Sequence, residues 1–314
     1  MKIVRRKMAL KGSGKKNTIK ILAQGDQHCD DPGHIHKSFD RFIEAVKEAP
    51  EGSGCFLLGD MFTFANTRSQ KALRKAFPDA TEDAQESVDG FVQEMARPLR
   101  KKLEPIKDRI WGMVEGNHGW RFQDGTTVDQ RLAEIMDVPY SDGMLIVCLN
   151  VSRHPSEGHG HSCRIVCHHG STGATTISGD INSLIKHQGY FSNAHIILEG
   201  HTHGLSVLPD ERLVITESTS EPMLKHQISW TARCGSSVGS YRPGKAGYPE
   251  RKMLKPSMPG HVEFDVWFEQ HYIGRKQKYI NGKLVNVENG RSTLDLCILG
   301  RTVPLQGVSV GVAG

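Results

Sequence analysis

Five short turns along the chain carry the kinds of side chain that bind metal ions, and each turn follows an apolar segment. The turns combine glycine or a polar neighbour with aspartate, asparagine or histidine: Asp26-Gln27-His28, Gly59-Asp60, Gly116-Asn117-His118, His168-His169-Gly170 and Gly200-His201-Thr202-His203. Imidazole, carboxylate and amide oxygen suit Mn²⁺, Fe, Zn²⁺ or Co²⁺, and a donor set without thiolate argues against a structural zinc site. These residue types predict metal-assisted chemistry.

The elements that must position these turns follow from hydrophobic patterning. Short apolar runs predict strands over residues 18–24, 55–58, 110–114, 145–151, 163–167, 195–198 and 261–269. Helical spacing predicts helices over residues 38–49, 68–102 (broken near Pro78 and Pro98), 127–136 and 181–187. Alternating strands and helices predict a layered α/β fold. Because sites in open α/β sheets form outside the carboxyl ends of the strands, the five turns should meet at one edge.

The number of ligand-type residues exceeds what one metal ion needs. Gly59-Asp60 alone is a common structural turn, whereas five strand ends that all carry such residues are hard to ascribe to chance. Seven side chains are available: Asp26, His28, Asp60, Asn117, His201, His203 and one of His168 and His169. Two ions about 3.5–4 Å apart and sharing one carboxylate would use them. His168 is the preferred histidine because it directly follows residues 165–167, and His169 is the alternative.

The order of the motifs resembles the calcineurin-like metallophosphoesterase superfamily. That family has Asp-x-His, Gly-Asp, Gly-Asn-His, a lone His and Gly-His-x-His, and all five occur here in this order between residues 26 and 203. The resemblance implies a four-layer α-β-β-α sandwich of two mixed β-sheets flanked by helices, with the ligand turns at the carboxyl ends of strands. It also implies a dinuclear hydrolase of phosphoesters that uses a metal-bound hydroxide. Manganese is the preferred metal, with iron, zinc, cobalt or magnesium as alternatives.

The resemblance also assigns a role to each residue. One metal would be held by Asp26, His28 and His203, and the other by Asn117, the lone histidine and His201, with Asp60 between the two. His118 would be the catalytic group beside the scissile phosphate. The family usually has an acid after Gly-Asn-His, whereas this chain has Gly119, so Asp124 and Asp142 are candidates to orient His118. Arg121 and His169 are candidates for substrate binding, and a surface salt bridge is the alternative for Arg121.

The rest of the chain predicts three parts. Residues 1–16 carry seven Lys and Arg and no acid, which predicts a basic flexible tail or, alternatively, an arm that contacts phosphates. Residues 17–235 would form the catalytic domain. Residues 236–314 would add a Gly/Pro-rich loop and a strand or hairpin extension packed on it, with a tight turn at Asn281-Gly282.

The amino-acid composition limits the cellular location and the binding partners that we expect. The seven scattered cysteines contain no Cys-x-x-Cys pair, and no apolar run is long enough to span a bilayer, so we expect a cytoplasmic protein without a membrane partner. The basic residues within 233–255 and the basic tail support one hypothesis, a nuclease or repair-type phosphodiesterase acting on DNA or RNA, with a charged solvated loop as the alternative for residues 233–255. The alternatives are a phosphatase or phosphodiesterase for small molecules or phosphoproteins, and a non-catalytic binding module, which the complete ligand set disfavours. The oligomeric state is not predicted.

Overall fold

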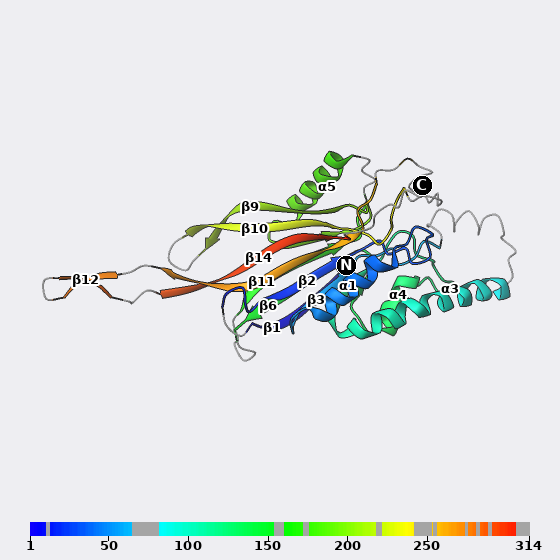
Figure 1. Ribbon diagram of the computed structural model, residues 1–314, viewed down its shortest axis with the longest axis horizontal. Coiled ribbons are helices and arrows are strands. Elements are labelled where there is room, and N and C mark those ends of the chain that lie inside the picture. The colour runs from blue at the N-terminus through cyan, green and yellow to red at the C-terminus, as the bar shows by residue number, and fades with distance from the viewer. Residues whose placement is uncertain are drawn as a thin grey trace, which may run out of the picture.

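Two six-stranded mixed sheets pack face to face, with helices on their outer faces (Figure 1). This computed structural model describes residues 1–10, 13–64, 82–153, 160–171, 176–217, 222–241, 253, 256–273, 276–280, 283–287 and 291–305. The layers confirm the predicted α-β-β-α sandwich.

The first sheet has the strand order β1-β6-β7-β8-β10-β9. Its strands are β1 (Lys2–Ala9), β6 (Met144–Ser152), β7 (His161–His168), β8 (Ile196–Glu199), β10 (Pro222–Cys234) and β9 (Leu205–Glu217). Strands β7, β8 and β10 run parallel, whereas β6 pairs antiparallel with β7 and β9 with β10. The mixture arises because β6–β7 and β9–β10 are hairpins, which only antiparallel strands can form.

The second sheet has the order β14-β11-β2-β3-β4-β5. Its strands are β14 (Arg291–Pro304), β11 (Gly260–Ile273), β2 (Ile19–Gln24), β3 (Gly54–Leu57), β4 (Ile110–Val114) and β5 (Tyr140–Ser141). The four strands from β2 to β5 are parallel, and β11 runs antiparallel to β2. A separate pair, β12 (Lys276–Ile280) and β13 (Lys283–Val287), is antiparallel, and the predicted turn at residues 281–282 lies outside the described residues.

Helices cover both outer faces. The second sheet is covered by α1 (His36–Glu48), α3 (Glu82–Leu103), the 3-10 helix η1 (Glu104–Arg109) and α4 (Val128–Ile135), and the first by α5 (Ile177–Tyr190). Helix α1 is strongly amphipathic and buries Phe39, Phe42 and Val46. Thr127 caps α4 by accepting the Gln130 amide, as its sequence position predicts. Ile135, the last residue of α4, is 55% exposed.

The main core lies between the two sheets. Alternate residues of the strands point into it, including Ile21 from β2, Val147 from β6, Ile165 from β7 and Phe264 from β11, and all four are fully buried. A second cluster lies between the second sheet and helices α1, α3 and α4. Among the described helices, none is both long and apolar enough to cross a membrane.

Three predictions about organisation need correction. Residues 2–9 are not a flexible tail but form β1, which pairs in parallel with β6, because alternate residues of this basic segment are partly buried. Residue 235 is not a domain boundary, since β11 lies between β14 and β2 and so belongs to the second sheet. Helix α3 continues through Pro98, and the predicted break at Pro78 lies outside the described residues.

Candidate metal centre

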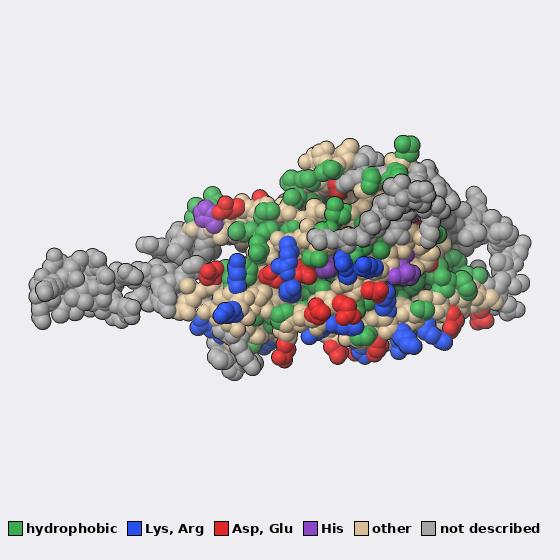
Figure 2. Space-filling model, in the orientation of Figure 1, with side chains coloured by type: hydrophobic (Ala, Val, Ile, Leu, Met, Phe, Trp, Pro, Cys, Tyr) green, Lys and Arg blue, Asp and Glu red, His purple; other side chains and the backbone are tan. Residues whose placement is uncertain are grey.

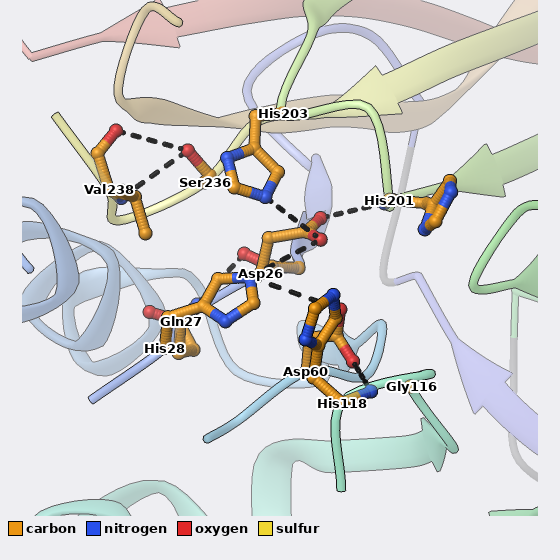
Figure 3. A network of polar contacts seen from close by, with 12 residues as sticks. Asp26, Gln27, His28, Asp60, Gly116, His118, His201, His203, Ser236 and Val238 are labelled. Carbon is orange, nitrogen blue, oxygen red and sulfur yellow. Dashed lines mark hydrogen bonds and ion pairs between the residues drawn. The ribbon is translucent and has the colours of Figure 1, made fainter. Parts of the chain in front are cut away.

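The five sequence turns meet where the two sheets adjoin. Strands β2, β3 and β4 are parallel neighbours in one sheet, and β7 and β8 are parallel neighbours in the other, so each set ends at one edge. Within each sheet the turn backbones bond to their neighbours: the amide of Gly200 donates to the carbonyl of His169, and the amide of Asp26 to that of Gly59. Across the two sheets, His169 Nδ1 donates to the Leu58 carbonyl and the His201 amide donates to Asp26 Oδ2. Figure 3 shows the side chains of Asp26, His28 and His203 pointing toward one another.

One group of three ligand-type side chains consists of Asp26, His28 and His203. Asp26 Oδ1 lies 3.5 Å from His203 Nε2 and 4.0 Å from His28 Nε2, while its Oδ2 accepts the His201 amide at 2.8 Å. His28 Nδ1 is 2.8 Å from the Thr63 hydroxyl, which leaves Nε2 facing the group. Asp26 Oδ1 and His28 Nε2 are buried without a hydrogen-bond partner among the described residues.

A second group consists of Asp60, His169 and His201. His169 Nδ1 donates to the Leu58 carbonyl at 2.6 Å, so its Nε2 faces the group, 3.2 Å from Asp60 Oδ2. The same Nε2 lies 3.1 Å from Oδ1 of Asn117, which adds an amide oxygen to this side of the site. Metal-binding histidines commonly hold a backbone carbonyl with the other ring nitrogen, because this fixes the ring's orientation and tautomer.

Asp60 lies between the two groups. Its Oδ2 is 3.2 Å from His169 of the second group and 3.9 Å from His28 of the first. Its Oδ1 accepts the backbone amide of His118 at 2.9 Å. A carboxylate in this position can contact cations in both groups, which is the role that the family resemblance implies for Asp60.

Backbone strain is concentrated in the same residues. Positive φ angles occur at Asp26 (52°), His28 (44°), Asp60 (51°), His201 (71°) and His203 (55°). Residues with side chains rarely adopt this left-handed region, and it costs of order 1–3 kcal/mol at each position unless the surroundings enforce it. Strain at five of the predicted ligands indicates that the turns are shaped to aim side chains, not merely to reverse the chain.

Burial and neighbouring charges shift the pKa values of these ligand-type groups. Burial raises the pKa of Asp26 to about 7, although nearby His169 opposes the shift. Burial lowers the pKa of His28 and, to about 4, those of His201 and His203, so these imidazoles are neutral, the form that binds metals. In the second group burial alone would raise the pKa of Asp60, but His169 holds it well below the usual range.

The residues present therefore fit two metal ions. Buried carboxylates without compensating cations are costly, and the unpartnered Asp26 Oδ1 and His28 Nε2 face the position that a cation would take. Two groups of one carboxylate and two imidazoles, with Asp60 adjacent to both, match a two-metal arrangement in donor type and number.

His118 lies beside the ligands but belongs to neither group. Its ring stands edge-on to that of His28, with ring centroids 5.4 Å apart, and its backbone amide is fixed by Asp60 (Figure 3). Gly119 sits against the start of α4 and supplies no acid. The two candidates to replace that acid have other partners: Asp124 binds Thr126 and Arg131, and Asp142 lies near the amino terminus.

The preference for His168 over His169 is corrected by the structure. Strand β7 extends to His168, and because side chains alternate along a strand, Cys167 points into the core between the sheets while His168 points to the opposite face. Val166, on that same opposite face, belongs to the cluster beside α5. His168 Nδ1 accepts the Gly170 amide at 2.8 Å. His169, the first residue past the strand, reaches the site instead.

Other predicted residues have different surroundings. Arg121, a candidate for substrate binding, pairs with Glu115 at 3.1 Å and donates to the Gly125 carbonyl, so a phosphate contact stays a prediction. Arg233, counted in the basic stretch 233–255, is fully buried. That stretch therefore begins in the core, and all of its remaining basic residues lie outside the described part of the chain.

Sequence reasoning missed several residues that support the turns. Asp129 on α4 is 1% exposed, and its Oδ2 accepts the Gly116 amide at 3.3 Å beneath the Gly116-Asn117-His118 turn. Burial raises the pKa of Asp129 to about 7. Thr63 links Asp30, which accepts its amide, to the ring of His28. An acid at an inward position of an amphipathic helix was the available signal for Asp129, whereas nothing in the sequence marked Thr63.

Comparison with known proteins adds little beyond this geometry. No protein-family model and no curated protein matches the chain. One solved structure that is similar to this chain is that of a conserved uncharacterized protein from Streptococcus pneumoniae TIGR4, described as a predicted phosphoesterase. The two sequences are 13% identical, the match covers 92% of this chain and 98% of that chain, and the TM-score is 0.33. Vps29 from Entamoeba histolytica complexed with zinc is 12% identical, with coverages of 89% and 99% and a TM-score of 0.34. Likenesses this weak carry no argument about this chain.

Proposed function

We propose that this protein is a phosphoesterase that depends on two divalent metal ions. The observation that carries the proposal is the position of Asp60, which belongs to the Asp60–His169–His201 group and also lies 3.9 Å from His28 of the Asp26–His28–His203 group. A single-ion site would not need a second complete set of donors on the far side of one carboxylate. The motif order that resembles calcineurin-like metallophosphoesterases supports the same reading.

The residues of the site have two roles, which are to bind the metal ions and to orient the ligands. When bound, two divalent ions lower the pKa of water and stabilise the negative charge that develops on phosphoryl oxygens. Asp26, His28 and His203 would hold one ion, His169, His201 and Asn117 would hold the other, and Asp60 would be shared between them. Thr63 and the Leu58 carbonyl orient the rings of His28 and His169, so the ligand nitrogens are aimed before a cation arrives.

His118 is the proposed general acid. It stands next to His28 without joining either donor group, and the bond from its amide to Asp60 ties its backbone to the shared carboxylate. From this position the imidazole can donate a proton to the leaving oxygen of a phosphoester held over the two groups. General acid–base catalysis by a positioned side chain contributes roughly 10²–10⁴-fold to a rate.

The substrate class is proposed as a phosphodiester or phosphomonoester, with DNA and RNA kept as candidates. Of the two sequence features behind that prediction, the basic N-terminal segment forms strand β1 and Arg233 of the basic stretch is buried, and a nucleic-acid substrate stays a prediction. Figure 2 shows basic and acidic side chains interspersed on the visible face, without a broad region of one sign among the coloured residues. The non-catalytic alternative is disfavoured because both donor groups are complete.

Hydrolysis assays on metal-stripped protein test the proposal. An aryl phosphodiester, an aryl phosphomonoester, single-stranded DNA and double-stranded DNA are each incubated without metal and with added Mn²⁺, Zn²⁺ or Mg²⁺. We expect hydrolysis of at least one aryl ester that appears only when metal is restored. Activity that survives complete removal of metal would contradict the proposal, and cleavage of the aryl diester without cleavage of either DNA would exclude the nuclease reading.

A further inference from the structure

A buried ion-pair network lies directly behind the turn that carries His201 and His203. Arg233 on β10 is fully buried, and its guanidinium is held by acids from two other elements. Its Nε donates to Asp180 Oδ1 on α5 at 2.8 Å, and its Nη1 donates to Glu199 Oε2 at the end of β8 at 2.6 Å. Its Nη2 donates to the hydroxyl of Ser183. We call Arg233, Asp180 and Glu199 the Arg233 bracket.

The bracket contacts both ends of the 200–204 turn. At the first end, Arg233 Nη1 lies 3.5 Å from the Gly200 carbonyl, and Glu199 is the residue before Gly200. At the other end, Asp180 Oδ2 is so close to Gly204 that a Cβ there would lie 2.7 Å from it. The carbonyl of Gly204 also accepts the amide of Gly235, two residues beyond Arg233. Contacts at both ends therefore hold the turn in place.

The turn needs such support because it is strained. His201 and His203 both have left-handed backbone angles, with φ of 71° and 55°. Strained conformations of this kind persist only where the surrounding structure enforces them. Glu199 and Asp180 are 2% and 7% exposed, and a buried arginine held by several charged and polar partners is a rigid anchor, because its planar fork fixes direction as well as distance.

The two histidines of this turn serve different donor groups. His203 belongs with Asp26 and His28, whereas His201 belongs with Asp60 and His169. We therefore infer that Arg233 is a positioning residue that sets the spacing of the two metal sites by clamping residues 200–204. This inference rests on the proposed function for its link to catalysis, but its effect on metal binding can be measured without any substrate.

The test compares Arg233→Met and Arg233→Lys with a matched control, Arg212→Met. Arg212 lies on the neighbouring strand β9 and anchors the same helix, since it donates to the carbonyls of Gln188 and Phe191 at the far end of α5. Mn²⁺ affinity and stoichiometry are measured by titration calorimetry, the backbone of the turn by amide hydrogen exchange in metal-free protein, and folding by thermal unfolding.

We expect Arg233→Met to weaken Mn²⁺ binding by roughly 10–100-fold, the usual effect of losing a group that orients ligands, and to speed exchange at the amides of residues 201–204. Arg233→Lys should recover part of the affinity, because one ammonium cannot hold Asp180 and Glu199 in the same fork. Arg212→Met should keep wild-type affinity even where it lowers the melting temperature.

The inference is overturned if folded Arg233→Met binds two Mn²⁺ with unchanged affinity. If that variant does not fold, Arg233→Lys and Asp180→Asn decide, and wild-type affinity in both would overturn it. Weakened Mn²⁺ binding in a protein that hydrolyses no phosphoester would support the positioning role while refuting the proposed function. Failure of the wild type to bind any of Mn²⁺, Zn²⁺ and Mg²⁺ would refute both.

Discussion

The two donor groups have the same composition but differ in which side chain carries a proton before metal binds. Each contains one aspartate and two histidines. In the first, burial raises the pKa of Asp26 to about 7 and lowers that of His203 to about 4, so near neutral pH the proton sits on the carboxyl group. In the second, burial would lower the pKa of His169, but the adjacent Asp60 outweighs it and raises the pKa to about 9.

The difference shows that burial and charge pairing compete within a few ångströms. Asp60 and His169 form an ion pair at 3.2 Å before any cation arrives, whereas Asp26 Oδ1 has no hydrogen-bond partner among the described residues. Desolvation dominates where no opposite charge touches the carboxylate, and pairing dominates where one does. A cation must therefore displace a proton from a carboxyl group in one group and from an imidazole in the other.

Asp60→Asn should have the largest effect, because this change removes the carboxylate that both groups share. We expect its rate to fall by more than the roughly 10²–10⁴-fold that losing a general acid costs, together with weaker binding of both ions. Steady-state rates and Mn²⁺ titration measure the two effects. Asp142→Asn, at an exposed carboxylate near the amino terminus, is the matched control. An undiminished rate in Asp60→Asn would contradict the bridging role.

His118→Asn should separate catalysis from metal binding. Because His118 belongs to neither donor group, this variant is expected to bind two ions with near wild-type affinity while its rate falls by roughly 10²–10⁴-fold. Single-turnover hydrolysis alongside metal analysis of the same sample distinguishes the two properties. Loss of a metal ion from this variant would show that His118 is a ligand.

Comparing His169→Ala with His168→Ala tests which of these two histidines belongs to the second donor group. His169 is adjacent to Asp60 and Asn117, so its loss should weaken Mn²⁺ binding by more than the roughly 10–100-fold typical of residues that only orient ligands. His168 points to the other face of β7, so the loss of Mn²⁺ affinity in His168→Ala should be smaller than roughly 10–100-fold. Titration of both variants under one set of conditions is sufficient. The reverse order would restore His168 as the ligand.

The pH dependence of metal binding should reveal the two proton arrangements. Ligands bind metals in their deprotonated forms, so affinity rises with pH until each group has lost its proton. His169, with a pKa near 9, should release about one proton between pH 7 and 9, and Asp26, with a pKa near 7, should add a second below pH 7. Calorimetry in buffers of different ionisation enthalpy counts these protons. Binding without proton release at pH 6 would contradict the account.

The sequence was sufficient to predict the ligand turns because their chemistry is local. Asp26, Asp60 and His201 each follow a strand that is recognisable from its apolar residues, and parallel strands of one sheet end at the same edge. The meeting of these edges from two different sheets depends on how the sheets pack. The choice between His168 and His169 failed because it depended on where β7 ends, and a shift of one residue reverses the face of a side chain. Strand limits are the least reliable part of such patterns.

Non-local supports could not be predicted from the sequence. In the sequence Arg233 looked like the first residue of a basic surface stretch. The acids that it contacts, Asp180 on α5 and Glu199 on β8, are distant in the sequence, and only the packed fold brings them together. Strand β1 was missed for a similar reason: its charged residues suggested a solvated tail, and its pairing partner β6 lies more than a hundred residues later. Charge pattern alone does not reveal which face of a segment is buried.

The most direct test of a two-metal centre is anomalous diffraction from crystals soaked in Mn²⁺. We predict two anomalous peaks about 3.5–4 Å apart, with Asp60 touching both. One peak should lie among Asp26, His28 and His203, and the other beside His169, His201 and Asn117. A single peak, or two peaks that do not share Asp60, would contradict the account.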